Sequence, residues 1–502
     1  MIDLKVKEMV SYELFLSNFK ETLKKSFYER DNIEKFSQQR GFPSLVFREI
    51  MANSPLSVAI PTKYGGRGCH VKECLGILAA SSYESLPLSL TFGINIALFL
   101  EPLAKYGHED IKPKIFNRFL QKQNMGGLMI TEPDYGSDAL NMQTSNVKIG
   151  DEYHIHGTKH WQGLTGIADY WIMTCRNKNQ DGKLSRDLDF FVCDEQADGQ
   201  SIEVEELFNN LGLYQIPYGR NKVDIKVPEE NKLIPETTGL KLMMDLLHRS
   251  RFQFAGMGMG FLQRNLDEAI KQTTTRFVSG KPLLELDQVK YQVSKLQSAF
   301  TICSGMCYRS AAYSGIENNL AGDMVEANSI KAYLTDLMQS SAQTLVQLCG
   351  ASGYLLENFG ARGIIDSRPF QIFEGSNEML YTQIGESILK LMKRGKMPNF
   401  KKFLEQYALT ALAVDHFKDC LNFNIDELLT QRKILDIGKV ISRLVSAQQV
   451  INLGAQGFRP DLINDCLLNI KHEVNQLLCS YSNHNAVEPK IEYLDNSSWL
   501  NF

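Results

Sequence analysis

The chain has 502 residues, of which 43% are hydrophobic and 22% charged, a balance typical of a globular protein with more than one domain. A formal net charge of -4 and an isoelectric point near 6.2, without a long basic block, argue against a nucleic-acid-binding protein. The N-terminal segment lacks the basic and apolar regions of a secretory signal, and the 10 cysteines include no CxxC pair. We therefore expect a cytoplasmic protein with reduced thiols.

Residues 1–125 show helical periodicity and predict an N-terminal helical domain. The longest uncharged run, at 85–100, contains Pro87, Gly93 and Asn95 and is short for a membrane span. We interpret it as a buried helix and expect no membrane contact.

Short β-rich runs separated by Gly, Asn and Asp fill residues 126–235 and predict a central, barrel-like β domain. His154, His156 and His160 have a spacing that resembles a set of metal ligands. Because Gly157 and Thr158 interrupt the strand between them, we predict no metal site.

Long amphipathic helices return in residues 236–395 and predict a C-terminal four-helix bundle. The basic, proline-containing stretch 393–402 is typical of a linker, and residues 396–502 read as an additional helical segment that packs on the body or on a partner subunit. The predicted fold class is thus α+β multidomain, with an N-terminal α-helical domain, a β domain, a helical bundle and a helical extension.

Two short segments draw attention to chemistry. The stretch MITEPDYGSDALNMQT, residues 129–144, is either a polar loop with turn and cap residues or a set of hydroxyls and amides for the polar edge of a cofactor. The stretch QIFEGSNEML, residues 371–380, carries Glu374 directly after the apolar pair Ile372 and Phe373. Glu374 is either an acid at a helix start, favoured by the helix dipole, or a base in a dry pocket.

Several motifs occur in one consistent order: ITEPDYGSDA (130–139), GTKHW (157–161), LDQVKYQVSKL (286–296), QLCGASGY (347–354) and FEGSNE (373–378), with Arg251 and Arg276 between the second and third. In these motifs the chain resembles the acyl-CoA dehydrogenase family from about residue 30 to residue 392. The resemblance implies the domain order given above, an FAD cofactor between the β domain and the bundle, and a homo-oligomer that is a dimer or a tetramer.

Carried over by position, the resemblance implies a role in FAD binding for a set of residues. Some of them, from Gln347 to Gly353, would approach the FAD of a neighbouring subunit. The full set is Met129, Ile130, Thr131, Ser137, Trp161, Arg276, Gln288, Gln347, Gly350, Ala351, Gly353 and Ser376.

The resemblance also implies the reaction, which belongs to fatty acid metabolism. Glu374 would be the catalytic base that removes the proton alpha to a thioester, while a hydride leaves the beta carbon for flavin N5. Ser137, Arg251 and Gly375 would lie at the substrate, and an electron-transfer flavoprotein or oxygen would accept the electrons. Some relatives place the base just before the arginine of an earlier helix; here that residue is Ser250, which leaves Glu374 as the candidate.

Several positions depart from the family pattern. Gly163 stands where a hydroxyl is common near the flavin, Ser279 replaces an aromatic residue, Ile365 replaces an arginine, and Glu386 replaces a basic residue. The stretch 213–220 lacks the serine that commonly meets the CoA nucleotide. A carrier-protein thioester therefore stays open beside acyl-CoA, as do a monooxygenase-type activity and a scaffolding flavoprotein. Residue types alone do not predict the length or the branching of the acyl chain of the substrate.

Overall fold

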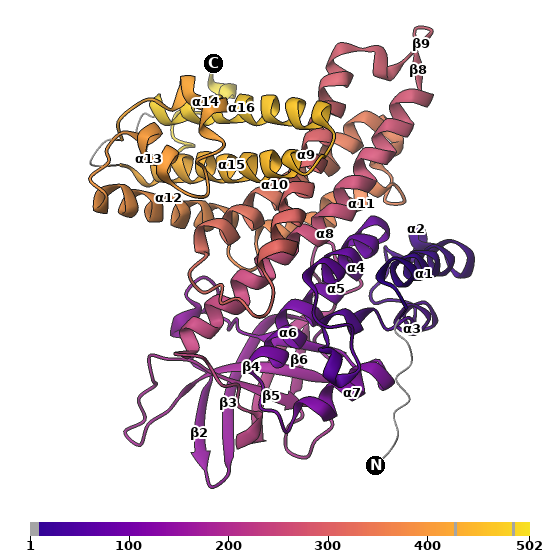
Figure 1. Ribbon diagram of the computed structural model, residues 1–502, viewed down its shortest axis with the longest axis vertical. Coiled ribbons are helices and arrows are strands. Elements are labelled where there is room, and N and C mark those ends of the chain that lie inside the picture. The colour runs from indigo at the N-terminus through magenta and orange to yellow at the C-terminus, as the bar shows by residue number, and fades with distance from the viewer. Residues whose placement is uncertain (1–9, 426–428, 484–486) are drawn as a thin grey trace.

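The computed structural model describes residues 10–425, 429–483 and 487–502. A β-sheet forms one end of the molecule and a stack of helices forms the other, and the long helix α8 (Gly239–Thr275) runs between them (Figure 1). The helices that precede the sheet in the chain form one group, in which α4 and α5 pack against α8 and α1 packs on α4. They are α1 (Tyr12–Lys25), α2 (Ile33–Phe36), α3 (Ser44–Met51), α4 (Val71–Glu84), α5 (Leu86–Asn95), α6 (Glu101–Tyr106) and α7 (Lys112–Lys122).

Helices α5 and α6 are joined without a break, so that Leu86–Tyr106 forms one apolar helical stretch. It is long and apolar enough to cross a membrane, but 94% of its most apolar window is buried inside the protein. Leu88, Phe92 and Phe99 are fully buried in the main core. The prediction of a buried helix is confirmed.

The sheet has seven strands in the order β1-β4-β2-β3-β7-β6, with β5 paired to β4. Strands β1 and β2 run parallel to β4, and the remaining pairs are antiparallel. A bulge in β3 shifts its register against β7 between His160 and Gln162. The strands are β1 (Gly126–Met129), β2 (Ser145–Ile149), β3 (Glu152–Gly163), β4 (Tyr170–Asn177), β5 (Asp189–Asp194), β6 (Glu203–Leu207) and β7 (Tyr218–Pro228).

The bundle is built from α8 and four later helices, with a short hairpin at its far end (Figure 1). Inward-facing side chains of α8, α9 and α10 belong to the same core as the N-terminal helices and the sheet. These elements are β8 (Phe277–Val278), β9 (Lys281–Pro282), α9 (Asp287–Tyr313), α10 (Met324–Cys349), α11 (Phe359–Ser367) and α12 (Asn377–Arg394).

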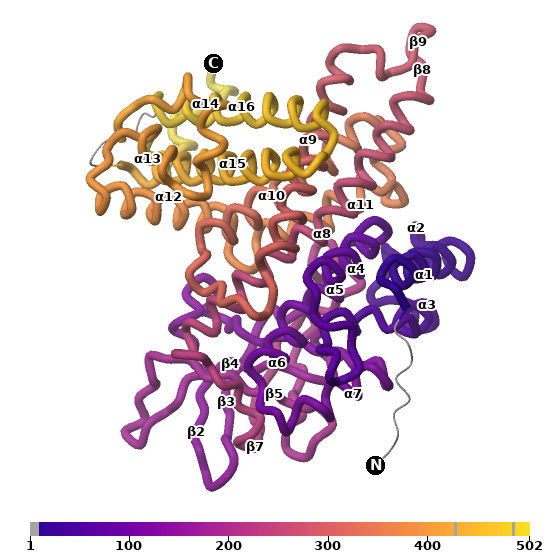
Figure 2. The backbone as a smooth tube through the Cα atoms, in the orientation of Figure 1, coloured from indigo at the N-terminus to yellow at the C-terminus, as the bar shows by residue number. Residues whose placement is uncertain are grey.

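The chain after residue 395 packs on the bundle. Helices α12, α15 and α16 lie side by side, as the trace in Figure 2 shows. Two glycines permit close approach: a Cβ built on Gly438 would lie 1.8 Å from the carbonyl oxygen of Tyr381, and one on Gly385 would lie 2.2 Å from that of Ile434. The added helices are α13 (Phe400–Gln406), α14 (Val414–Leu421), α15 (Gln431–Ala455) and α16 (Pro460–Ser482). The predicted fold class, including the helical extension on the body, is confirmed.

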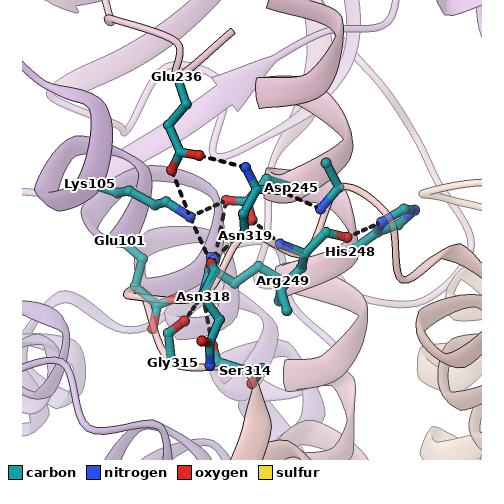
Figure 3. A network of polar contacts seen from close by, with 12 residues as sticks. Glu101, Lys105, Glu236, Asp245, His248, Arg249, Ser314, Gly315, Asn318 and Asn319 are labelled. Atoms are coloured by element: carbon teal, nitrogen blue, oxygen red, sulfur yellow. Dashed lines mark hydrogen bonds and ion pairs between the residues drawn. The ribbon is translucent and has the colours of Figure 1, made fainter.

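A buried polar network ties the N-terminal helices to the bundle (Figure 3). Asp245 of α8 bonds Lys105 of α6 at 3.3 Å and Arg249, one turn further along α8, at 3.0 Å. Arg249 also donates to carbonyl oxygens of the α9–α10 loop, at 2.7 to 2.8 Å. Because a buried guanidinium is stable only when its donors are satisfied, this network fixes α8 in position just before Ser250 and Arg251. The carbonyls belong to Ser314, Gly315 and Asn318.

Candidate active site

Glu374 lies in a tight turn between a short 3-10 helix, Arg368–Gln371, and the start of α12. Its φ is 52°, and that of Gly375 is 94°, so both residues are in left-handed backbone. Such a conformation costs a residue with a side chain roughly 1–3 kcal/mol and persists only where the surroundings impose it. Here Phe370 and Phe373 impose it by packing on each other and on Phe254 of α8, with ring centroids 4.9 to 6.1 Å apart.

The Glu374 carboxylate points back to α8. Ser250 donates a hydrogen bond to Oε1 at 2.9 Å, whereas Oε2 is buried and has no partner among the described residues. Burial raises the pKa of this carboxyl, and Arg251, Ser250 and Lys331 only partly oppose that rise. The site therefore holds a carboxylate with a raised pKa and one unsatisfied oxygen. It does not cap α12, whose N-cap residue is Ser376.

Two buried cations hold the turn through its backbone. Arg251 donates from Nη2 to the carbonyl oxygen of Glu374 at 2.8 Å and from Nη1 to Asn328 at 2.6 Å. Lys331 donates to the carbonyl oxygen of Gly375 at 2.7 Å, and burial lowers its pKa to about 7. Because both bind carbonyls, neither neutralises the carboxylate directly. Arg251, predicted at the substrate, has both terminal nitrogens on protein atoms.

The predicted flavin-edge residues lie together on the sheet. Met129 is fully buried, while Ile130 and Thr131 are partly exposed. The backbone of His160 and the side chain of Gln162 both donate to the carbonyl oxygen of Thr131, at 2.8 and 3.2 Å. The bulge in β3 thus joins the 157–163 motif to the 129–131 motif at one edge.

Trp161, on that bulge, has a φ of 64° and is 52% exposed. Its ring contacts Phe208 at 4.5 Å between centroids and Tyr218 at 6.5 Å. An exposed indole whose position is fixed by a left-handed backbone can stack on a planar ring system. Together with the partly exposed Thr131 and the unsatisfied oxygen of Glu374, it fits the FAD that the sequence implies.

Contacts through α5 connect the sheet edge with α8. A Cβ built on Gly163 would lie 3.0 Å from Ile94, and one on Gly93 would lie 2.9 Å from Met257, two turns beyond Ser250 on α8. These contacts also give a steric reason for glycine at position 163, where the family commonly has a hydroxyl residue. Ile94 and, at 3.3 Å, Tyr218 occupy the space that a side chain at residue 163 would need.

The other predicted cofactor residues lie at the far end of the bundle. Thr275, the last residue of α8, is about 36 Å from Arg251 along the helix axis. A separate core cluster that includes Leu266, Val289 and Leu348 holds this end together. The residues it brings together are Arg276, Gln288, Gln347, Gly350, Ala351 and Gly353. Ser137 and Ser376 are exposed, on the 132–144 loop and at the start of α12.

Sequence reasoning missed a buried ion pair under the 129–144 segment. Lys159 of β3 bonds Glu132 at 3.0 Å and also donates to the carbonyl oxygen of Ile130 at 3.0 Å. The backbone N–H groups of Gln143 and Thr144 donate to the same carboxylate. The pair closes the polar loop and fixes the strand end that carries Thr131. Two features of the sequence could have indicated this pair: Lys159 occupies an inward-facing position of a predicted strand, and Glu132 precedes a proline in a predicted turn.

Asp366, which matches the family pattern, accepts a hydrogen bond from the backbone of Leu213 at 2.6 Å, and burial raises its pKa to about 6. In the stretch 213–220, which lacks the expected serine, Ile216 is fully buried. Ser250, considered only as a position without a base, proves to be the hydrogen-bond partner of Glu374.

Comparisons with known proteins agree with this architecture. Residues 12–123, 127–224 and 237–389 match the N-terminal, middle and C-terminal domain models described as acyl-CoA dehydrogenase. An acyl-CoA dehydrogenase of Bacillus subtilis (strain 168) is 23% identical over 353 residues, covering 69% of this chain and 90% of that protein.

Two solved structures show the same fold. An acyl-CoA dehydrogenase complexed with FAD from Bacillus anthracis superimposes with a TM-score of 0.74 at 16% identity, covering 96% of this chain and 90% of the other. A prolyl acyl carrier protein oxidase, AnaB, gives a TM-score of 0.68 at 19% identity, covering 75% and 98%. The first match extends over the added helices.

Proposed function

The chain belongs to the acyl-CoA dehydrogenase family, and on that premise we propose that Glu374 is the base that removes the α-proton of an acyl thioester. The protein is an FAD-dependent oxidoreductase that acts on CH–CH donors. FAD, when bound, accepts the hydride that leaves the β-carbon. The product would be the α,β-unsaturated thioester.

The observation that carries the proposal is the state of the Glu374 carboxylate. Its Oε2 atom is buried and has no partner in the part of the chain that the structure describes, so it is free to take a proton from a carbon acid. A raised pKa brings a carboxylate closer to the working pH and makes it a stronger base. Ser250, on Oε1, orients the group without consuming the second oxygen.

The turn also offers a donor for the thioester carbonyl. No backbone acceptor binds the N–H of Glu374 among the described residues. Glu374 and Gly375 have a left-handed conformation. The side chains of Arg251 and Lys331 stabilise it by donating to the carbonyl oxygens of Glu374 and Gly375, respectively. A fixed N–H stabilises the negative charge that develops on a thioester oxygen as the α-proton leaves.

We place FAD by the same reasoning. Met129, Ile130 and Thr131 would meet the polar edge of its ring system and Trp161 one face, with Ser137 and Ser376 nearer its other parts. The group at the far end of α8, from Arg276 to Gly353, lies too far from Glu374 to serve the same FAD. It would serve the FAD of a neighbouring copy in a dimer or tetramer.

The thioester carrier has two candidates. Acyl-CoA is favoured by the family models and by the Bacillus subtilis relative. A carrier-protein thioester is favoured by the stretch 213–220, which has no serine for a CoA nucleotide, and by the structural likeness to a carrier-protein oxidase. An electron-transfer flavoprotein is the proposed acceptor.

Anaerobic titration of the FAD-loaded protein tests the proposal. Saturated acyl-CoAs of increasing length should bleach the flavin absorbance, with one length range giving the fastest reduction. Bleaching by an acyl carrier protein thioester alone would replace CoA as the carrier. If neither thioester bleaches a flavin that dithionite reduces, dehydrogenation is refuted and a monooxygenase-type or scaffolding flavoprotein takes its place.

A further inference from the structure

The turn that carries Glu374 is clamped on both sides by one carboxylate. Asp336 of α10 accepts from the side chains of Gln371 and Asn377, each at 2.7 Å, through its Oδ1 atom. These two residues flank Glu374 by the same number of positions. Asp336 therefore connects the two ends of the turn, and at Asn377 it acts together with Lys331, Ala332 and Thr335 of the same helix.

The second oxygen of Asp336 leads away from the turn. The hydroxyl of Tyr381, one turn into α12, donates to Oδ2 at 2.7 Å and accepts from Nη1 of Arg443 at 3.1 Å. Tyr381 is 1% exposed, so the hydroxyl that makes both bonds is buried. A hydroxyl that donates to a carboxylate and accepts from a guanidinium is polarised in one direction, which strengthens both bonds.

Arg443 comes from α15, in the added helical segment. It is buried, bonds Glu473 of α16 at 3.1 Å and lies 4.0 Å from the ring centroid of Tyr333. Its side chain reaches Tyr381 because Gly385 and Gly438 let α12 and α15 approach closely. The guanidinium therefore bonds a carboxylate of the segment directly and reaches Asp336 of the bundle through the Tyr381 hydroxyl.

We propose that Arg443 is a positioning residue for the catalytic turn: through Tyr381 and Asp336, the added segment fixes the backbone that presents Glu374. The role of Glu374 rests on the proposed function, whereas the positioning of the turn does not. The segment is then part of the active-site support, and its removal would change catalysis as well as stability.

Hydrogen exchange followed by mass spectrometry tests the positioning without any substrate. Tyr381→Phe removes the linking hydroxyl and keeps the ring. Tyr333→Phe is the matched control, because the Tyr333 hydroxyl is buried beside the same Arg443 but lies outside the chain of hydrogen bonds that runs from Arg443 through Tyr381 to Asp336. In Tyr381→Phe, amide exchange over residues 372–378 should rise roughly fivefold relative to Tyr333→Phe.

Arg443→Gln should raise exchange in the same segment, and Arg443→Lys should restore part of the protection. Equal exchange in the two tyrosine variants would overturn the proposal, as would a rise spread evenly over α12 and α15, which would indicate packing alone. Flavin reduction by acyl-CoA gives a separate comparison, in which Tyr381→Phe should lower kcat and leave KM nearly unchanged. If no thioester reduces the wild-type protein while the exchange result holds, the proposed function fails and the positioning role remains.

Discussion

The sheet region and the bundle each contain a glutamate in a short turn, the buried Glu132 and the half-buried Glu374, and the partners of the two carboxylates differ. Glu132 has Lys159 and two backbone N–H groups on its carboxylate, and despite burial its pKa is lowered. Glu374 has one hydroxyl, and the cations near it bind carbonyl oxygens instead. Its pKa is raised by burial.

The comparison shows that burial alone does not make a base. Both glutamates hold carboxylate oxygen away from water, but of the two only Glu374 has an oxygen without a hydrogen-bond partner among the described residues. In the sheet, a complete set of partners makes Glu132 part of the structure that holds Thr131 in place. In the bundle, the missing partner leaves room for a substrate proton.

Replacing the base gives the largest expected effect. Glu374→Gln keeps the shape of the side chain and removes its basicity, so flavin reduction by an acyl thioester should slow by about 10²- to 10⁴-fold. Stopped-flow absorbance measures the rate, and the flavin spectrum of the resting protein should be unchanged. Reduction within a fewfold of the wild-type rate would move the base elsewhere.

Breaking the ion pair in the sheet should affect stability instead. Lys159→Met leaves the Glu132 charge buried and unpaired, so the free energy of unfolding should fall by about 3–5 kcal/mol. Lys222→Met is the control, because Lys222 pairs with Glu203 at 3.0 Å on the exposed side of the same sheet and should contribute under about 1 kcal/mol. Urea unfolding compares the two; equal losses would contradict a structural role specific to Glu132.

Removing the hydroxyl that donates to the Glu374 carboxylate should have the smallest effect. The Ser250 hydroxyl lowers the pKa of Glu374, so Ser250→Ala should raise it further. Because the ionised form is the base, the rate of flavin reduction rises with pH, and its midpoint should move to higher pH in the variant. Ser310→Ala, which loses another buried hydroxyl packed on α8, should leave the midpoint in place. A shift to lower pH in Ser250→Ala would mean that the hydroxyl does not stabilise the carboxylate.

The sequence sufficed for the order of helices and strands because their hydrophobic periodicity is local. The sequence also sufficed to single out the motif around Glu374, because a carboxylate that follows an apolar pair is visible from residues adjacent in the chain. It did not predict Ser250 as the partner of Glu374, which is 124 positions away in the chain. Nor did it predict the link from Asp336 to Arg443, because that contact depends on how closely α12 and α15 pack. The left-handed backbone at Glu374 was equally hidden, since its neighbours impose it.

The polar network around Arg249 has a consequence for how this protein tolerates sequence change. The loop between α9 and α10 meets the guanidinium through main-chain oxygens, which every amino acid carries. Substitutions at these loop positions would keep the hydrogen bonds by which Arg249 connects the loop to α8. Shortening the loop by one residue would displace the three carbonyl oxygens together, so the bonds to Arg249 depend on the length of the loop more than on the side chains at Ser314, Gly315 and Asn318.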